Sequence, residues 1–265
     1  MLEILEYNFI QNALIAGVLI SIAAGIMGSL IVVNKITFLT GGIAHSSYGG
    51  IGIAIYLGLP ILFGATVFAV ITAVLIALLT LNNRTRTDAI IGMMWAFGMA
   101  VGIIFVDLTP GYNVDLMSYL FGSIIAVSND DILYMGVLDV LIVSIVLFFY
   151  KELLSVSYDS QFAKLRGVNV EFFYTLILIL ASLCVVAAIK AVGLILVIAL
   201  LTIPTYLAEA FSTKLSQMMI ISSIFACIFT LSGLVISYMY DISSGASIII
   251  SAVVILTLVK LIKRK

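Results

Sequence analysis

About nine apolar segments follow one another along this chain, separated by short polar stretches. The segments cover residues 9–33, 36–58, 60–81, 89–106, 132–150, 170–189, 192–211, 216–239 and 244–262. A helix of roughly 20 apolar residues can cross the hydrocarbon core of a bilayer, where the backbone must satisfy its own hydrogen bonds. We therefore predict an all-α fold, a polytopic bundle of about 8–9 transmembrane helices. The lower count stays open because segment 36–58 starts with polar and glycine residues.

The composition excludes an ordinary soluble protein. Hydrophobic residues make up 64% of the chain and charged residues 9%, whereas soluble domains carry roughly a quarter charged residues. The net charge of −1 gives no reason to expect a nucleic-acid partner. Cys184 and Cys227 lie in apolar segments, so we interpret them as small buried hydrophobes and not as a disulfide. The chain has no Gly-rich loop ending in Lys-Ser or Lys-Thr, so no nucleotide site is predicted.

Basic residues predict the orientation, because Lys and Arg gather on the cytoplasmic side of membrane proteins. The basic residues between the segments, and at or after the end of the last one, are Lys35, Arg84, Arg86, Lys151, Lys164, Arg166, Lys214, Lys260, Lys263, Arg264 and Lys265. Placing them in the cytoplasm makes the first segment run inward and leaves the C-terminus cytoplasmic. Lys190 is the exception on the outer side. The outer acids, which either attract cations or are simply solvated, are Asp107, Asp115, Asp130 and Asp131.

Two further features interrupt the apolar pattern. Residues 116–127 are apolar but too short to span comfortably, so we expect an interfacial or partly inserted helix. Pro204 is expected to break segment 192–211, as glycines are expected to break segment 36–58. Broken segments in corresponding positions of two halves are a feature of transport sites.

His45 is the only histidine of the chain and lies among small residues in segment 36–58. A helix places two rows side by side: Gly41, His45 and Gly49 in one, and Gly42, Ser46 and Gly50 in the next. Small residues at a spacing of four let a neighbouring helix approach closely, so this helix is predicted to be central. His45 is then either a metal or proton ligand, or a polar residue hydrogen-bonded to a neighbouring helix. One histidine is too few ligands for a complete metal site.

The stretch DSQFAKLRG, residues 159–167, differs from the rest of the chain. Asp159 can cap a short amphipathic helix, and Gly167 supplies a C-terminal stop. A short capped helix between two spans is either a docking element for a partner or an ordinary interfacial helix.

Six stretches, in order, resemble the membrane permeases of bacterial ABC importers for zinc, manganese or iron. They are NALIAGVLISIAAGIMGSLIVVNKITFLTGGIAHSSYGGIGIAIYLG, TDAIIGMMWAFGMAVGIIF, DLMSYLFGSIIAVSNDDI, DSQFAKLRGVNVEFFY, AAIKAVGLILVIALLTIPTYLAEAF and GLVISYMYDISSGASIII. Each alone is a weak signal, but six in the right order are specific, and they cover nearly the whole chain.

The resemblance implies a single permease domain, residues 1–265, in the inner membrane of a bacterium. It implies a homodimeric or pseudo-dimeric pore, supplied by an extracellular or periplasmic metal-binding protein and driven by two cytoplasmic ABC ATPase subunits. The chain itself would then be no enzyme and bind no cofactor, and the transported ion would be a divalent metal, zinc ahead of manganese or iron. His45 would line the translocation path. The cytoplasmic segment of about 151–169 would couple to the ATPase through Asp159, Ala163 and Gly167.

One departure from the family pattern concerns the residue one turn before His45. The commoner pattern has an Asp there, which forms an Asp/His pair suited to a transition metal, and this chain has Gly41. We expect the symmetry-related His45 of a second copy to replace this Asp in part. The alternatives are an ion-coupled secondary transporter, which would need paired charges inside the spans, and a non-transporting assembly subunit. An intramembrane enzyme would need a nucleophile–base pair or several metal ligands, which the sequence lacks.

Overall fold

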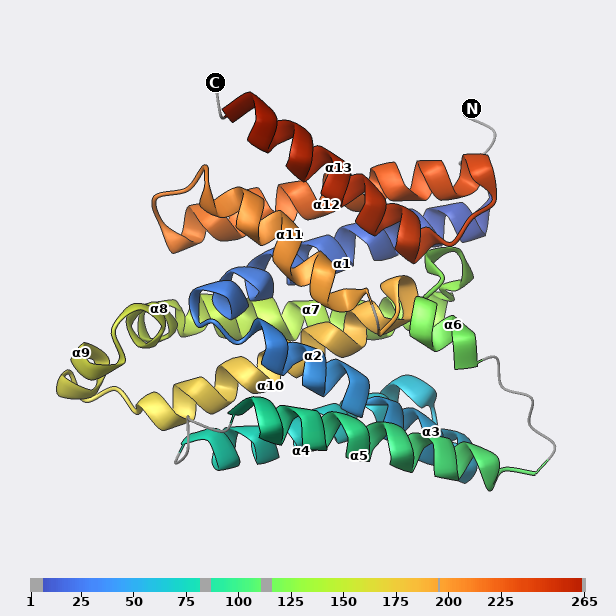
Figure 1. Cartoon of the computed structure of the whole chain (residues 1–265), viewed down its shortest axis with the longest axis horizontal. Helices are drawn as coiled ribbons and strands as arrows, with labels where there is room; N and C mark the ends of the chain where they lie inside the picture. Colours follow the sequence, from blue (N-terminus) through green and yellow to red (C-terminus); the bar gives the residue numbers. More distant parts are fainter. Residues whose placement is uncertain (1–6, 82–86, 111–115, 195, 264–265) are drawn as a thin grey trace. The chain divides into compact units, whose positions relative to one another are not determined.

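A computed structural model describes residues 7–81, 87–110, 116–194 and 196–263, and every regular element in these ranges is helical (Figure 1). The elements are α1 (Asn8–Val33), α2 (Thr37–Ser46), α3 (Tyr48–Leu57), α4 (Ile61–Leu81), α5 (Thr87–Asp107), α6 (Leu116–Phe121), η3 (Ile124–Ala126), α7 (Asn129–Phe148), α8 (Tyr150–Tyr158), α9 (Ser160–Leu165), α10 (Val170–Val192), α11 (Val197–Glu209), α12 (Leu215–Tyr240) and α13 (Ser244–Lys263). The all-α prediction is confirmed. Five residues used to predict the orientation lie outside the described residues: Arg84, Arg86, Asp115, Arg264 and Lys265.

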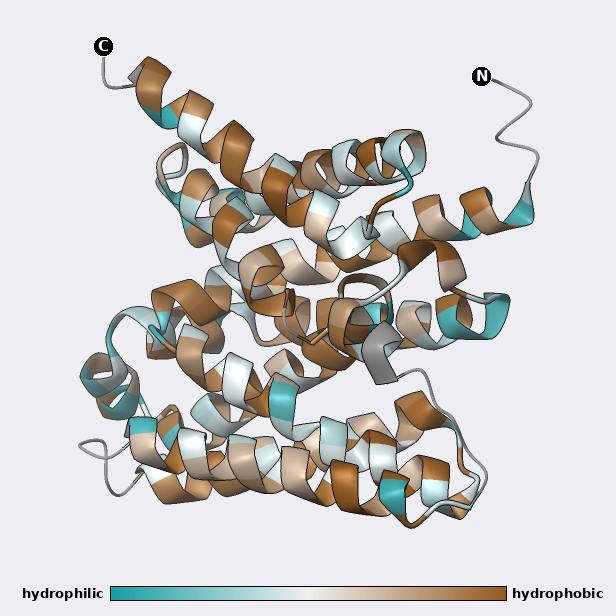
Figure 2. Ribbon diagram, turned by 45° about the vertical axis from the view of Figure 1, so that its right-hand side comes forward, coloured by the Kyte–Doolittle hydropathy of each residue, from teal (hydrophilic) through white to brown (hydrophobic). Residues whose placement is uncertain are grey.

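In the described ranges, 7 helices are long and apolar enough to cross a membrane, namely α1, α4, α5, α7, α10, α12 and α13. Figure 2 shows hydrophobic residues along most of this helical ribbon. The other two predicted segments are shorter: residues 36–58 form α2 and α3, of 10 residues each, and residues 192–211 contain α11, of 13 residues. Residues 116–127 form the short α6 and η3, as their length suggested. The count of 8–9 spans stays a prediction.

The chain divides into two compact units. The first unit comprises residues 1–32, 116–144 and 187–265, and the second comprises residues 33–115 and 145–186. Both units are therefore assembled from segments far apart in the sequence, and each is described by itself below.

In the first unit, glycines of α1 let other helices approach its backbone directly. A side chain at Gly25 would overlap the backbone of Ser223 in α12, and one at Gly28 would overlap the carbonyl oxygen of Leu201 in α11. Thr205 Oγ1 of α11 lies 2.8 Å from Ser222 Oγ of α12. In a lipid environment, close backbone packing and interhelical hydroxyl contacts are what hold helices together, because lipid is as apolar as a leucine side chain.

The predicted break at Pro204 is wrong, because α11 runs through this residue from Val197 to Glu209. A proline inside a helix removes one backbone donor. The side chain of Thr205 donates to the carbonyl oxygen of Leu201 at 3.0 Å, and Pro204 itself is buried. The Thr205 bond does not replace the one lost at Pro204, whose acceptor would be the carbonyl oxygen of Leu200, but local hydroxyl bonds and tight packing help membrane helices to accommodate proline.

In the second unit, the predicted close approach at the small-residue rows is confirmed. A side chain at Gly42 would overlap Ile91 of α5, one at Gly50 would overlap Gly64 of α4, and one at Gly52 would overlap Gly102 of α5. The helix pair α2–α3 thus packs against α4 and α5 with almost no side chain between the backbones.

We predict that Gly98→Ala destabilises the protein and that Gly92→Ala, on the same helix, does not. A methyl group at Gly98 would overlap the backbone of Ser46, whereas no described atom lies within 4 Å of one at Gly92. Overpacking of this kind costs about 1–3 kcal/mol. Thermal unfolding of the two purified variants in the same detergent measures the effect. Equal midpoints for both variants would contradict the packing described for α5.

Candidate functional site

The segment around His45 is a pair of short helices, so segment 36–58 is broken as expected, but at Ser47 and not at one of its glycines. Ser47 separates α2 from α3, although its own backbone is right-handed helical, with φ −59° and ψ −19°. Ser46 Oγ donates to the carbonyl oxygen of Ile43 at 2.9 Å, and Ser47 Oγ donates to that of Ala44 at 2.6 Å. Hydroxyl groups that bond to the preceding turn compete with the helical pattern and bend helices. The interruption therefore falls at Ser47, which follows directly after His45 and Ser46.

His45 is buried, with 8% of its surface exposed, and stacks on Trp95 of α5. The two ring centroids are 3.9 Å apart and the ring planes differ by 7°. The ring nitrogen Nδ1 is buried and has no hydrogen-bond partner among the described residues. For this nitrogen the structure offers no bond to a neighbouring helix, which was the alternative to a ligand role.

His45 has no ready-made set of companion ligands within its own chain. In the described residues, no three side chains of His, Cys, Asp or Glu lie close enough to hold a metal ion together. Gly41, at the position of the family's Asp, is buried in α2. A cation at His45 would therefore need ligands from outside this set, such as a second copy of the chain, water or backbone carbonyl groups.

Asp139, in the middle of α7, is a residue that the sequence analysis missed. It is buried, and neither carboxylate oxygen has a hydrogen-bond partner among the described residues. An acid within an apolar span is rare and is by default a candidate for function. Its position inside segment 132–150 was the available signal.

Lys190 and Asp131 form an ion pair, which explains the exception in the predicted charge pattern. Lys190 Nζ lies 2.8 Å from Asp131 Oδ2. The same oxygen accepts hydrogen bonds from the backbone nitrogen of Ser128 at 2.9 Å and from Ser128 Oγ at 2.6 Å. Of the outer acids, Asp131 is thus engaged within the chain and is not a free cation-attracting group.

Three of the recognised motifs meet at one glycine junction, defined by Gly122, Gly193 and Gly245. Gly122 and Gly193 have positive φ angles, 70° and 85°, and a side chain on either would overlap the backbone of the other's loop. A side chain at Gly245 would crowd the carbonyl oxygens of Phe121 and Val192. These motif glycines therefore have a packing role, because only glycine permits both the dihedral angles and the contact.

The helix α9 has the capped form that the sequence predicted. Asp159 Oδ1 accepts a hydrogen bond from the backbone nitrogen of Phe162 at 2.8 Å. At the other end, Gly167 has φ 80°, and its nitrogen and that of Val168 bond to the carbonyl oxygens of Lys164 and Ala163. This pair of backbone hydrogen bonds is a Schellman motif.

The exposed surface of α9 includes apolar side chains that the sequence analysis did not single out. Ala163 is buried, whereas Leu165 is 86% exposed and Phe162 is 51% exposed. The guanidinium of Arg166 lies 5.6 Å from the centre of the Phe162 ring. Asp159, Ala163 and Gly167 therefore shape the helix, and Phe162 and Leu165 are the side chains that a partner could touch.

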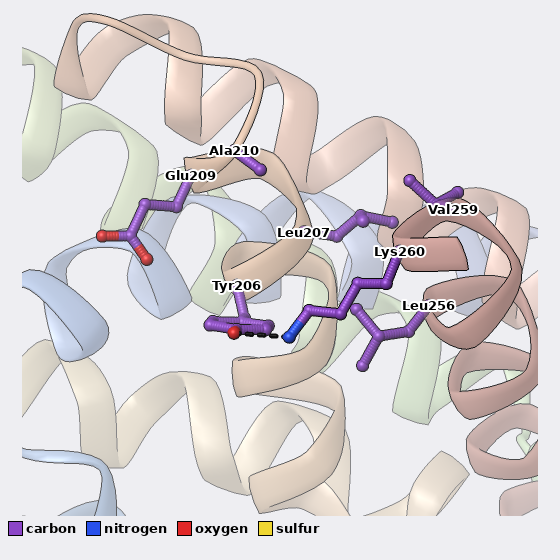
Figure 3. Close-up of a pocket in the computed structure, with 7 residues that line it drawn as sticks. All are labelled: Tyr206, Leu207, Glu209, Ala210, Leu256, Val259 and Lys260. Atoms are coloured by element: carbon purple, nitrogen blue, oxygen red, sulfur yellow. Dashed lines mark hydrogen bonds between the residues drawn. The ribbon is translucent and has the colours of Figure 1, made fainter. Parts of the chain in front are cut away.

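A pocket of about 210 Å³ lies in the first unit between α11 and α13 (Figure 3). Lys260 Nζ donates to the phenol oxygen of Tyr206 at 2.6 Å and lies 4.3 Å from the centre of its ring. Figure 3 shows the side chain of Glu209 extending away from this ammonium group. The remaining lining is mostly apolar, so the pocket presents one cation and no set of metal ligands.

These features define a polytopic helical membrane protein with a buried histidine between glycine-packed helices. Residues 6–263 match the ABC 3 transport family, and the chain belongs to this family. The resemblance inferred from the six motifs is thereby confirmed.

The chain is 42% identical to the uncharacterized membrane protein slr2045 of Synechocystis over 95% of its length and 90% of the relative's. It is 32% identical to the manganese transport system membrane protein MntC of Listeria monocytogenes, over 95% of this chain and 90% of that protein. A solved structure, PsaBC from Streptococcus pneumoniae in complex with Fab, aligns with a TM-score of 0.87 and 31% identity. That alignment covers 96% of this chain and 91% of the other.

We predict that Lys190→Met lowers the thermal midpoint and that adding Asp131→Asn recovers part of the loss. The single change leaves a largely buried carboxylate without its cation, which costs about 1–3 kcal/mol. Thermal unfolding of both variants, with Lys190→Arg as the charge-preserving control, measures the coupling. A double variant no more stable than Lys190→Met would rule out an energetic role for the pair.

Proposed function

We propose that this chain is the permease subunit of an ATP-driven importer that moves divalent transition metal ions into the cytoplasm. The observation that carries the proposal is the buried His45, whose Nδ1 has no partner among the described residues. A neutral imidazole nitrogen is a common ligand for such ions. Membership of the ABC 3 transport family supports the transport class.

The relatives' names shift the preferred cargo from zinc to manganese. Besides the Listeria protein, a relative from Streptococcus gordonii with 31% identity is named a manganese import system permease protein, ScaB. Imidazole suits zinc and iron, and Gly41 lacks the oxygen ligand that manganese favours, so the residues of this site do not themselves favour manganese. We keep all three ions as cargo and place manganese first on the names of the relatives alone.

The whole chain, residues 1–265, is proposed to act as one permease domain in the inner membrane, with its C-terminus in the cytoplasm. Two copies would place two His45 side chains near a common axis, which would partly replace the absent Asp. Cytoplasmic ABC ATPase subunits would supply the energy, and an extracellular metal-binding protein would deliver the ion. The chain itself would carry out no chemical reaction.

The segment 151–169 is proposed to couple the permease to the ATPase. Two structural observations support this. The helix α9 is fixed at both ends by Asp159 and Gly167, and it exposes the apolar side chains of Phe162 and Leu165. Ala163 would contribute by packing α9 onto its own chain, since it is buried.

Asp139 is the observation that keeps an ion-coupled secondary transporter as the second candidate, because such carriers use acids within their spans. Uptake into proteoliposomes separates the two candidates. An ATP-driven importer requires its ATPase and ATP, whereas a secondary carrier responds to an imposed ion gradient without them. A non-transporting assembly subunit would give no uptake under either condition.

We predict that His45→Ala and His45→Gln both reduce metal uptake by at least about 10-fold, because neither side chain replaces an imidazole ligand. Uptake of ⁵⁴Mn²⁺ and ⁶⁵Zn²⁺ into proteoliposomes that contain the assembled transporter measures the effect. Thermal midpoints and ATPase co-purification serve as controls for folding. Full uptake by His45→Gln would show that a polar packing role is enough.

We predict that Leu165→Asp weakens co-purification with the ATPase and lowers uptake by at least about 10-fold, because it places a charge on the apolar face of α9. Leu133→Asp, which changes another exposed leucine, in α7, should leave ATPase binding intact. Unchanged ATPase binding in Leu165→Asp would exclude α9 as the docking element.

A further inference from the structure

The candidate site contains a stack between the rings of His45 and Trp95. Trp95 is the only tryptophan in the chain, and its half-buried indole lies nearly parallel to the imidazole, with ring centroids 3.9 Å apart. The indole Nε1–H of Trp95 donates to Met99 Sδ at 3.1 Å, one turn further along α5. The indole is thus held by its own helix while its face covers the imidazole.

Two glycine contacts bring α2 and α5 close together on either side of the stacked rings. Gly42 of α2 lies against Ile91, one turn before Trp95, and Gly98 lies against Ser46, the residue that follows His45. The contacts lie on either side of the rings, so α2 and α5 approach closely at both points, and a side chain at Gly42 or Gly98 would push the two helices apart. The distance between the rings is therefore set by the backbones and not by the aromatic side chains alone.

A histidine that binds a metal is normally oriented by a hydrogen bond from its second ring nitrogen. In His45 the nitrogen proposed to take the metal is Nδ1, to which no described residue bonds. The parallel indole supplies a constraint of a different kind, because an imidazole stacked at this distance keeps its plane while leaving the in-plane lone pair of Nδ1 open to a ligand. Aromatic pairs of this kind contribute beyond the area they bury.

We propose that Trp95 is a positioning residue, whose indole orients the His45 imidazole toward the transported divalent cation. This proposal rests on the function proposed above. Loss of the indole is expected to raise the metal concentration for half-maximal uptake by roughly 3- to 10-fold, with the maximal rate nearly unchanged. The phenyl ring of Trp95→Phe retains a stacking face and should restore most of the affinity.

The first test uses the single tryptophan as a reporter. The purified full-length permease in detergent is titrated with MnCl₂ and with ZnCl₂ while the tryptophan emission is recorded. A saturable change of the emission in wild type that is abolished in His45→Ala supports metal binding at the stacked ring. A change of emission of equal size in His45→Ala would overturn the proposal.

The second test compares uptake kinetics of Trp95→Leu, Trp95→Phe and Phe97→Leu in proteoliposomes with the ATPase. Phe97, an exposed aromatic residue of the same helix, is the matched control. A raised metal concentration for half-maximal uptake in Trp95→Leu alone supports the proposal that Trp95 positions the His45 imidazole. An unchanged value, or an equal loss of maximal rate in all three, would overturn it. Uptake insensitive to His45→Ala would instead refute the proposed function, so the two failures are distinguishable.

Discussion

The structure depends on helix backbones that touch without side chains between them. Gly25 and Gly28 do this for α1 in the first unit, and Gly50 and Gly52 do it for α3 in the second. In a bilayer, burial of apolar surface gives little reason for one helix to prefer another helix over lipid, so the number and closeness of contacts decide which helices associate. The position of His45 depends on contacts of the same kind, those of Gly42 with Ile91 and of Gly98 with Ser46.

The same constraint explains why the candidate site is a stack and not a cluster. Where two backbones are in contact, only side chains at the margin of the contact have room, and they must be flat or small. Trp95 and His45 satisfy this condition by lying face to face. The site therefore gains its order from the packing around it, and hydrogen bonds to Nδ1 play no part among the described residues.

Much of the architecture could be predicted from the sequence, because apolar length and local end signals are properties of single segments. The all-α fold and the cap of α9 by Asp159 belong to this class. The pairing of Lys190 with Asp131, the stack on Trp95 and the continuity of α11 through Pro204 could not be predicted. Each depends on which faces of distant segments meet, and a single sequence does not contain that information. Asp139 was visible in the sequence but lacked a partner that would have drawn attention to it.

The two caps of α9 have a consequence for association. A helix of 6 residues has too few internal hydrogen bonds to persist in water by itself. Here Asp159 and the turn at Gly167 hold it in shape before any partner arrives. A protein that binds its exposed side chains meets a preformed surface, so little conformational entropy is lost on contact. The free energy of such a contact would then remain available for holding the two proteins together.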